Sequence, residues 1–385
     1  MYALFKLNTR YFILQKNIDK MQPSSYQLIS YIAPAAPATR RSAIGDEPFL
    51  RPEIGFTPKW YHISLGIDFG QKWHTDPAYR RETVLSMHAE LQRRFPGCHI
   101  GSSEKTGSTL DLVTGTYGAC TIAAIYGVPI LYSTYKWPVC AQQYLSDEQM
   151  DTLEPPDLAN NLQYQALMSQ IEWIAAHEGR VEGFINWQGV LNNAHRLRGE
   201  ALFMDMIDSP DRARNLFHCV CNTMIEAARG LHRRQKKTGV VVDFFTMSNC
   251  LVNMVSAKHY YELLLPFDLR IADAFECVGI HNCAWNADPY LESYAKIPRV
   301  GYLDMGQESD LKRARALFQK TRRAIMYTPM DLSNKSISDI RQDLERIAQN
   351  YGPCDLVAAD IEAGTPDRRI MDVIRICEEI SKAMG

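Results

Sequence analysis

The chain has 385 residues, enough for two average domains or for one large α/β barrel, and either can bury a substantial core. Its 42 basic and 44 acidic residues nearly balance, which excludes a global field that attracts nucleic acid or an anionic membrane, so we expect neither as a partner. Ten irregularly spaced cysteines without a secretory signal predict a reducing cytoplasm, where thiols serve as core residues, ligands or nucleophiles.

The amino-terminal part of the chain lacks the pattern of a packed domain. Charged residues interrupt every apolar run in residues 1–20 well short of a membrane span, and a weak transit peptide is the alternative interpretation. The segment 31–43 is rich in proline and alanine, which is typical of an extended tether. We therefore expect residues 1–48 to form an extension and residues 49–385 to form the folded domain.

From there on, short β-like runs alternate with helical stretches, the pattern of a parallel sheet covered by crossover helices. In chain order we expect a helix over 79–95, buried apolar chain over 120–132, a helix over 158–177, a strand over 181–189, helices over 201–207 and 211–237, a strand over 239–247, a helix over 256–276, strands over 278–283, 299–305, 324–332 and 354–361, and a final helix over 366–384. About eight β/α units without a break in composition predict one closed (β/α)8 TIM barrel. A doubly wound open sheet is the alternative.

In a parallel barrel the chemistry takes place at the carboxyl ends of the strands, so the residues that follow each apolar run are candidates for function. These candidates are Asn186, Trp187, Asn249, Cys250, His281, Asn282, Cys283, Asp304, Asp331, Asp360, Ile361 and Glu362. No phosphate-binding glycine loop and no G-x-S-x-G elbow follows a strand, which argues against nucleotide-binding and serine-hydrolase sites.

The segment GIHNCAWN, residues 279–286, places His281 and Cys283 two residues apart. On an extended strand such residues project to the same side, so both side chains can reach one atom above the barrel. Imidazole nitrogen and thiolate sulfur are ligands that zinc prefers, and a catalytic zinc has three protein ligands and one open position. The alternative is a core cysteine with a histidine for a neighbour.

A third ligand has to come from another strand end. The last strand offers Asp360 and Glu362, again two residues apart, and Glu362 is preferred because it reaches further toward the open end. Cys250 is a weaker candidate. Cys354 precedes its strand and belongs to the opposite end of the barrel.

Several segments between about residues 61 and 381 carry a family resemblance. GFINWQGVLNNAHRLRGEALFMDMIDSPDRARNLF, NMVSAKHYYELLLPFDLRIADAF, GIHNCAWN and CDLVAADIEAGTPD follow one another in this order. The order resembles the uroporphyrinogen decarboxylase superfamily, a (β/α)8 barrel group that includes zinc-dependent corrinoid methyltransferases. The third segment falls where the methyltransferase branch has its H-x-C-G motif, although Ala284 replaces the usual glycine.

The resemblance implies that His281 and Cys283 bind zinc, and that a methyl group moves between a corrinoid on a separate protein and a small substrate. A thiol, a folate or a methoxylated aromatic are the candidate substrates. In the methyltransferase branch a cysteine from the last strand completes the site. Because no cysteine stands at residues 360–362, either a carboxylate takes this place or the metal is lost.

Further residues are assigned roles around this centre. Asp304 and Asn249 are the candidates for orienting substrate, and Asn186, Trp187 and Trp285 are the candidates for contact with the cofactor. Two other functions stay open: a metal-free decarboxylase-like lyase that protonates through an aspartate such as Asp304, and a corrinoid-binding barrel without chemistry. The sequence also leaves a homodimer open.

The decarboxylase proper binds a polycarboxylate through an arginine-rich amino-terminal stretch. The corresponding residues 49–77 contain one arginine, Arg51, and are dominated by aromatic side chains such as Trp60 and Trp73. An aromatic site predicts a smaller, less charged substrate and a wide mouth that is largely uncharged at its centre. Ordinary core packing is the alternative for these aromatic residues.

Overall fold

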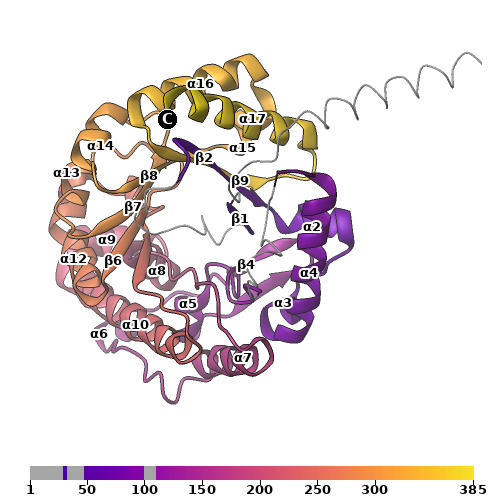
Figure 1. Cartoon of the computed structure of the whole chain (residues 1–385). Helices are drawn as coiled ribbons and strands as arrows, with labels where there is room; N and C mark the ends of the chain where they lie inside the picture. The colour runs from indigo at the N-terminus through magenta and orange to yellow at the C-terminus, as the bar shows by residue number, and fades with distance from the viewer. Residues whose placement is uncertain (1–28, 33–46, 99–109) are drawn as a thin grey trace, which may run out of the picture.

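The computed structural model describes residues 29–32, 47–98 and 110–385. Within this part of the chain, seven parallel strands form one sheet in the order β1-β2-β9-β8-β7-β6-β5. The strands are β1 Ile29–Ile32, β2 Leu50–Phe56, β5 Phe244–Ser248, β6 Cys277–His281, β7 Val300–Gly306, β8 Arg322–Tyr327 and β9 Cys354–Ile361. In Figure 1 the strands curve around a common centre and the helices surround them on the outside. The predicted TIM-barrel-like α/β fold is therefore confirmed.

Helices connect the strands because parallel neighbours need a crossover from one end of the sheet to the other. The helices are α2 Pro58–Leu65, α3 Gln71–Thr75, α4 Pro77–Arg94, α5 Thr121–Ile125, α6 Asp147–Asp151, α7 Leu162–Glu178, α8 Val190–Arg198, α9 Ala201–Asp208, α10 Pro210–Lys237, α11 Ala257–His259, α12 Leu265–Ala274, α13 Leu291–Tyr294, α14 Leu311–Leu317, α15 Pro329–Asn334, α16 Ile337–Tyr351 and α17 Asp367–Met384. A 3₁₀ turn, η2 (Val252–Met254), follows β5, and a π-helical turn, η3 (Tyr260–Leu264), joins α11 to α12. Two further strands, β3 (Ile130–Ser133) and β4 (Lys136–Cys140), form a separate antiparallel pair. No described helix has the length and apolarity needed to cross a membrane.

The strand predicted over residues 181–189 is absent from the sheet. Gly183 has a φ of 94° and Gln188 a φ of 62°, and neither value fits an extended strand. Between them, the N–H of Trp187 donates to the carbonyl of Ile185 at 3.0 Å, which folds the backbone on itself. Residues 181–189 are therefore not a strand, because the backbone turns at Gly183 and again near Gln188.

This irregular segment nevertheless fills a place in the barrel wall. The N–H of Phe184 donates to the hydroxyl of Thr114 at 3.2 Å on one side. On the other side, the Phe184 ring meets the ring of Phe244 on β5 edge to face, at 6.3 Å between centroids. The wall continues past β5 through packing, without a ladder of backbone hydrogen bonds.

The amino-terminal boundary is only partly described. Ile29–Ile32 pairs in parallel with β2, although it lies within the predicted extension, residues 1–48. The folded chain continues from Leu50, one residue after the predicted start. Residues 1–28, on which the transit-peptide alternative rests, lie outside the described residues. The division of the chain near residue 48 stays a prediction.

A buried ionic cluster fills the barrel near the amino ends of three strands. Asp355 on β9 is fully buried and accepts hydrogen bonds from Arg51 Nε and Nη2 at 2.9 and 2.8 Å. Arg322 on β8 donates its Nε–H to the same carboxylate at 2.9 Å. The one arginine of residues 49–77 is therefore neutralised inside the barrel, at the end opposite the strand termini that carry the candidate site.

The aromatic residues expected at the mouth lie in the core. Trp60 and Trp73 are each 1% exposed. The ring of Trp60 packs on Phe56 at 4.3 Å between centroids, and Trp73 donates its indole N–H to the hydroxyl of Thr83 at 3.0 Å. The expectation that these two residues line the mouth is wrong, because Trp60 packs against β2 and Trp73 packs against α4 and the ring of Trp137.

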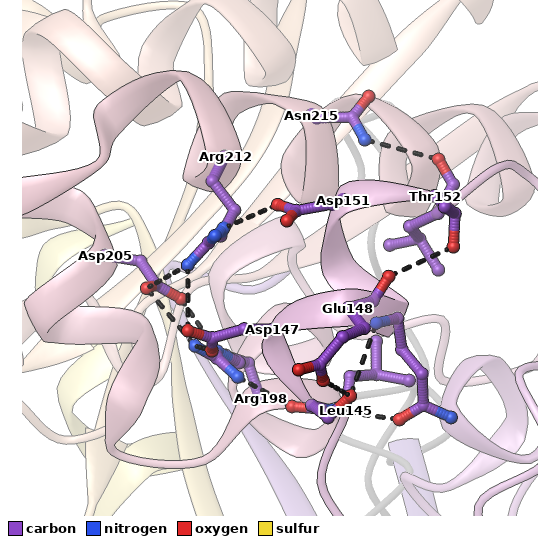
Figure 2. Close-up of polar contacts among 12 residues, drawn as sticks. Leu145, Asp147, Glu148, Asp151, Thr152, Arg198, Asp205, Arg212 and Asn215 are labelled. Atoms are coloured by element: carbon purple, nitrogen blue, oxygen red, sulfur yellow. Dashed lines mark hydrogen bonds and ion pairs between the residues drawn. The ribbon is translucent and has the colours of Figure 1, made fainter.

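The helix α8 is fixed in place by charged contacts and by one close backbone approach. Arg198 at its end pairs with Asp205 of α9 at 2.7 Å and also contacts Asp147 of α6, as Figure 2 shows. At the other end, Gly189 precedes α8 so closely to β5 that a Cβ there would lie 2.5 Å from the carbonyl oxygen of Ser248. One end of α8 is therefore held against β5 and the other against α6 and α9.

Replacing Gly189 with alanine should lower the free energy of unfolding by about 1–3 kcal/mol, since the new methyl group has to push α8 away from β5. Urea denaturation of Gly189→Ala against wild type measures this change. Gly364→Ala is the matched control, because nothing lies within 4 Å of its added Cβ. Equal stability of all three proteins contradicts the close approach.

Candidate metal centre

Three side chains converge at the carboxyl end of the barrel. The thiol of Cys283 lies 3.0 Å from the sulfur of Cys250 and 3.1 Å from Nε2 of His281. The ligand atoms of all three residues lie within 4.8 Å of one another, and no other His, Cys, Asp or Glu group in the described ranges comes together in this way. Two thiols and an imidazole are a donor set that suits zinc.

The strands β5 and β6 bring these residues together. Ser248 pairs with His281 in the sheet, and the N–H of Asn249 donates to the carbonyl of His281 at 2.7 Å, so Cys250 follows directly beside the histidine. The strand predicted to continue through Cys283 ends at His281. A left-handed backbone at Cys283, with a φ of 55°, turns its side chain toward the other two ligands. The pair meets through a turn and not along one face of a strand.

Asp304 on β7 orients the histidine. It is fully buried, and its Oδ2 lies 2.7 Å from Nδ1 of His281 while its Oδ1 accepts the N–H of Asn282 at 2.9 Å. A carboxylate that accepts the Nδ1 proton leaves Nε2 free to coordinate a metal, which is the usual support for a metal-bound histidine. The residue predicted to orient substrate therefore contacts His281.

The same contacts shift the acidities of the group. Burial alone lowers the pKa of His281, but the charges of Asp304 and Cys250 outweigh it and raise the pKa to about 9. The hydrogen bond from Cys283 holds the pKa of Cys250 well below its usual range, and the charge of His281 adds to this effect. The site thus favours a thiolate at Cys250, the form that binds metal.

The carboxylates predicted as third ligand lie apart from this group. Asp360 has a φ of 53° and lines the same pocket, where burial raises its pKa and the charge of His281 opposes this rise. Glu362 is exposed beyond the end of β9. The structure places Cys250 closer to the pair than either carboxylate, because β5 is hydrogen-bonded to β6 whereas β9 lies three strands away. Cys354 starts β9 at the opposite end, as expected.

The three side chains open into a pocket of about 460 Å³, a size that suits a small molecule. Its lining consists of Ala119, Asn186, Gln188, Asn192, His195, Arg196, Cys250, Leu251, His281, Cys283, Met326, Ala359 and Asp360. Five non-glycine residues of the described chain have a positive φ, and three of these line the pocket: Gln188, Cys283 and Asp360. Strained backbone of this kind gathers at functional sites.

The other predicted residues are only partly assembled here. Asn186 lines the pocket and accepts hydrogen bonds from the N–H and the side-chain amide of Gln188 at 3.2 and 2.8 Å. Asn249 is buried and donates to Asp268 at 3.0 Å. Trp187 is buried outside the pocket lining, and Trp285 is 51% exposed on the loop after Cys283.

The wall of the pocket that α8 and the turn before it form was not identified from the sequence. Gln188, Asn192 and Arg196 are spaced four residues apart along α8 and the turn before it, and His195 lies beside them. Polar residues at this spacing share one face of a helix. The spacing therefore indicates a polar face on this helix. Which face of α8 lines the pocket depends on how the helix packs against the barrel.

Replacing Asp304 with asparagine should weaken zinc binding by about 10–100-fold, because the histidine loses the carboxylate that fixes its ring and raises its basicity. Competition with a chromogenic chelator measures the affinity. Asp288→Asn on the exposed loop after the site is the control. Unchanged zinc affinity in Asp304→Asn contradicts the orienting role.

Comparison with known proteins places this chain in a family. The sequence pattern of uroporphyrinogen decarboxylase (URO-D) matches residues 103–358. Among solved structures, a methyltransferase from Methanosarcina mazei is similar, with 12% identity, a TM-score of 0.62 and coverage of 93% of this chain and 95% of that chain. A B12-independent methionine synthase from Shewanella sp. W3-18-1 has 9% identity, a TM-score of 0.41 and coverage of 80% and 87%. No curated protein matches the sequence. The first structural likeness shows a shared fold, and with the URO-D match over more than half of its length the chain belongs to the uroporphyrinogen decarboxylase family.

Proposed function

We propose that this protein is a zinc-dependent corrinoid methyltransferase of the uroporphyrinogen decarboxylase family. The observation that carries the proposal is the convergence of Cys250, His281 and Cys283 at the carboxyl end of the barrel. The similar structure from Methanosarcina mazei is a methyltransferase, which supports this choice.

The residues present fit a catalytic zinc. Two thiols and one imidazole supply three protein ligands and leave one position for substrate, and Asp304 prepares the imidazole for coordination. Bound there, zinc would act as a Lewis acid that lowers the pKa of a thiol or polarises an ether oxygen. The protein's own residues hold the metal, and the pocket wall from Asn186 to Arg196 holds the substrate beside it.

The corrinoid is proposed to arrive on a separate protein. A pocket of about 460 Å³ suits a small substrate, so a large macrocycle has to face it from outside. Trp285, half exposed on the loop after Cys283, is the candidate contact for the macrocycle. We expect a transient complex of micromolar or weaker affinity with the carrier. A cytoplasmic location agrees with ten cysteines, none of which forms a disulfide within the described residues.

The metal-free decarboxylase alternative has less support. Arg51 is bound to Asp355 inside the barrel, so residues 49–77 offer no described guanidinium for a polycarboxylate. Asp304, the proton donor in that reading, hydrogen-bonds His281 and is fully buried.

The test is a cobalt-spectrum assay. Zinc-loaded protein receives methylcob(III)alamin or photoreduced cob(I)alamin together with thiols, folates or methoxylated aromatics. We expect one substrate class to change the cobalt spectrum, and His281→Ala to abolish the change. Loss of carbon dioxide from uroporphyrinogen, with no substrate altering the cobalt spectrum, would establish the decarboxylase alternative.

A further inference from the structure

The pocket beside the candidate metal centre contains one cationic side chain from α8. Arg196 is partly buried and lines the same cavity as Cys250, His281 and Cys283. Arg196 is thus a charged residue in a mouth that the sequence predicts to be largely uncharged at its centre. What this guanidinium binds decides which small molecules the pocket accepts.

No carboxylate of the described residues pairs with Arg196. Its Nη1 donates to the carbonyl of Asn192 in its own helix at 3.2 Å, and it also hydrogen-bonds the thiol of Cys140. A hydrogen bond from Cys120, and then the charge of Arg196, lower the pKa of Cys140 to about 7. These partners occupy a minority of the five N–H donors of a guanidinium.

Arg198, two residues further along α8, shows the contrast. It pairs with Asp205 at 2.7 Å and contacts Asp147, and Arg212 adds to the same network by pairing with Asp151 at 3.0 Å (Figure 2). Arg198 is thus satisfied within the protein and serves to hold α6, α8 and α9 together. Arg196 faces the cavity, and a partly buried guanidinium without a carboxylate partner among the described residues is stabilised by an anion that enters the cavity.

The wall around Arg196 is rigid and polar. The side-chain amide of Asn192 donates to the side-chain oxygen of Gln188 at 3.0 Å, and its Oδ1 accepts the N–H of Leu251, next to Cys250, at 3.2 Å. These bonds tie the wall of α8 to the loop that carries a metal ligand. The part of α8 that carries Arg196 is therefore tied to the loop with Cys250, as the support of a specificity residue requires.

The pocket also contains one carboxylate, and it belongs to a different part of the wall. Asp360 lies at the end of β9, and the charged groups that influence its pKa are His281 and Glu362. The pocket therefore has an anionic side near the last strand and a cationic side on α8.

We propose, resting on the proposed methyltransferase function, that Arg196 binds a carboxylate of the small methyl donor or acceptor while the reacting thiol or ether of the same molecule lies at Cys250, His281 and Cys283. A guanidinium can hold a carboxylate through two parallel hydrogen bonds, which gives both affinity and orientation. Substrates of this protein are then small carboxylic acids and not neutral methyl compounds.

The test measures binding instead of turnover. Calorimetry on zinc-loaded, corrinoid-free protein compares two pairs of probes: mercaptoacetate with mercaptoacetamide, and meta-methoxybenzoate with meta-methoxybenzamide. We expect the carboxylate of at least one pair to bind about tenfold or more tightly than its amide, as a charged hydrogen bond of about 1.5–3 kcal/mol predicts. The pair that shows the preference identifies the reacting end as a thiol or an ether.

Variants assign the preference to one residue. Arg196→Gln should bind the carboxylate and the amide equally, and Arg196→Lys should keep part of the preference. Arg368→Gln, at a side chain that is 82% exposed, should keep all of it. Zinc content and thermal unfolding of each variant show that the fold and the metal centre persist.

The outcomes separate the two proposals. No preference for the carboxylate in either pair, or a preference that persists in Arg196→Gln, overturns the role of Arg196 and leaves methyl transfer untouched. A preference that depends on Arg196, found together with an inert cobalt spectrum, supports the carboxylate site and contradicts the methyltransferase function.

Discussion

Replacing Cys250 with serine is expected to lower the affinity for zinc by more than about 100-fold, because loss of a direct ligand should exceed the 10–100-fold effect of losing an outer-shell partner. The sulfur of Cys250 lies 3.0 Å from that of Cys283, and its pKa is lowered by the hydrogen bond from Cys283 and by His281. A serine hydroxyl cannot supply a thiolate at neutral pH. Competition with a chelator measures the affinity in both proteins.

The matched control is Cys277→Ser, a cysteine at the opposite end of β6. It should bind zinc like wild type. The carboxylate alternative is tested in parallel with Glu362→Gln and Asp360→Asn. If Cys250→Ser keeps its zinc while one of these two variants loses it, a carboxylate of the last strand completes the site.

Replacing Asp355 with alanine is expected to lower the free energy of unfolding by about 3–5 kcal/mol, because it leaves two buried guanidinium groups without their shared acid. Arg51 and Arg322 both donate to this fully buried carboxylate. Each of them would then keep its charge inside the barrel with a weaker partner or none. Urea denaturation measures the loss.

Asp211→Ala is the control for this change, since the Asp211 side chain is 97% exposed in its ion pair and should alter stability by less than about 0.5 kcal/mol. A loss of stability in Asp355→Ala that is no larger than in this control shows that the buried cluster does not hold the barrel together.

The sequence predicted the fold well where apolar runs were bounded by polar residues. The runs that became β6, β7 and β9 were placed to within two residues, and the end of β6 identified His281 and Cys283. The strand predicted over 239–247 begins five residues later, and the one predicted over 324–332 ends five residues earlier, because residues 329–332 begin α15. The strand predicted over residues 181–189 was wrong, because an apolar run does not reveal the positive φ values at Gly183 and Gln188.

The candidate third ligand and the pocket wall depend on how strands pair and how α8 is rotated. The spacing of apolar residues in the sequence does not give either of these. Cys250 lies two residues beyond β5, and only the pairing of β5 with β6 sets it beside His281. Spacing along the last strand favoured Glu362, but that strand is remote from β6 in the sheet. Arg196 was missed because the sequence does not give the rotation of α8 about its axis. Trp60 and Trp73 were assigned to the mouth because aromatic side chains suit cores and binding sites equally.

X-ray absorption at the zinc edge of zinc-loaded wild-type protein tests most directly whether Cys250, His281 and Cys283 hold the metal. These residues predict about one zinc per chain, with two sulfur neighbours at about 2.3 Å and an imidazole nitrogen at about 2.0 Å. A single sulfur neighbour with added oxygen, or protein that retains no zinc after dialysis without chelator, would contradict this metal centre.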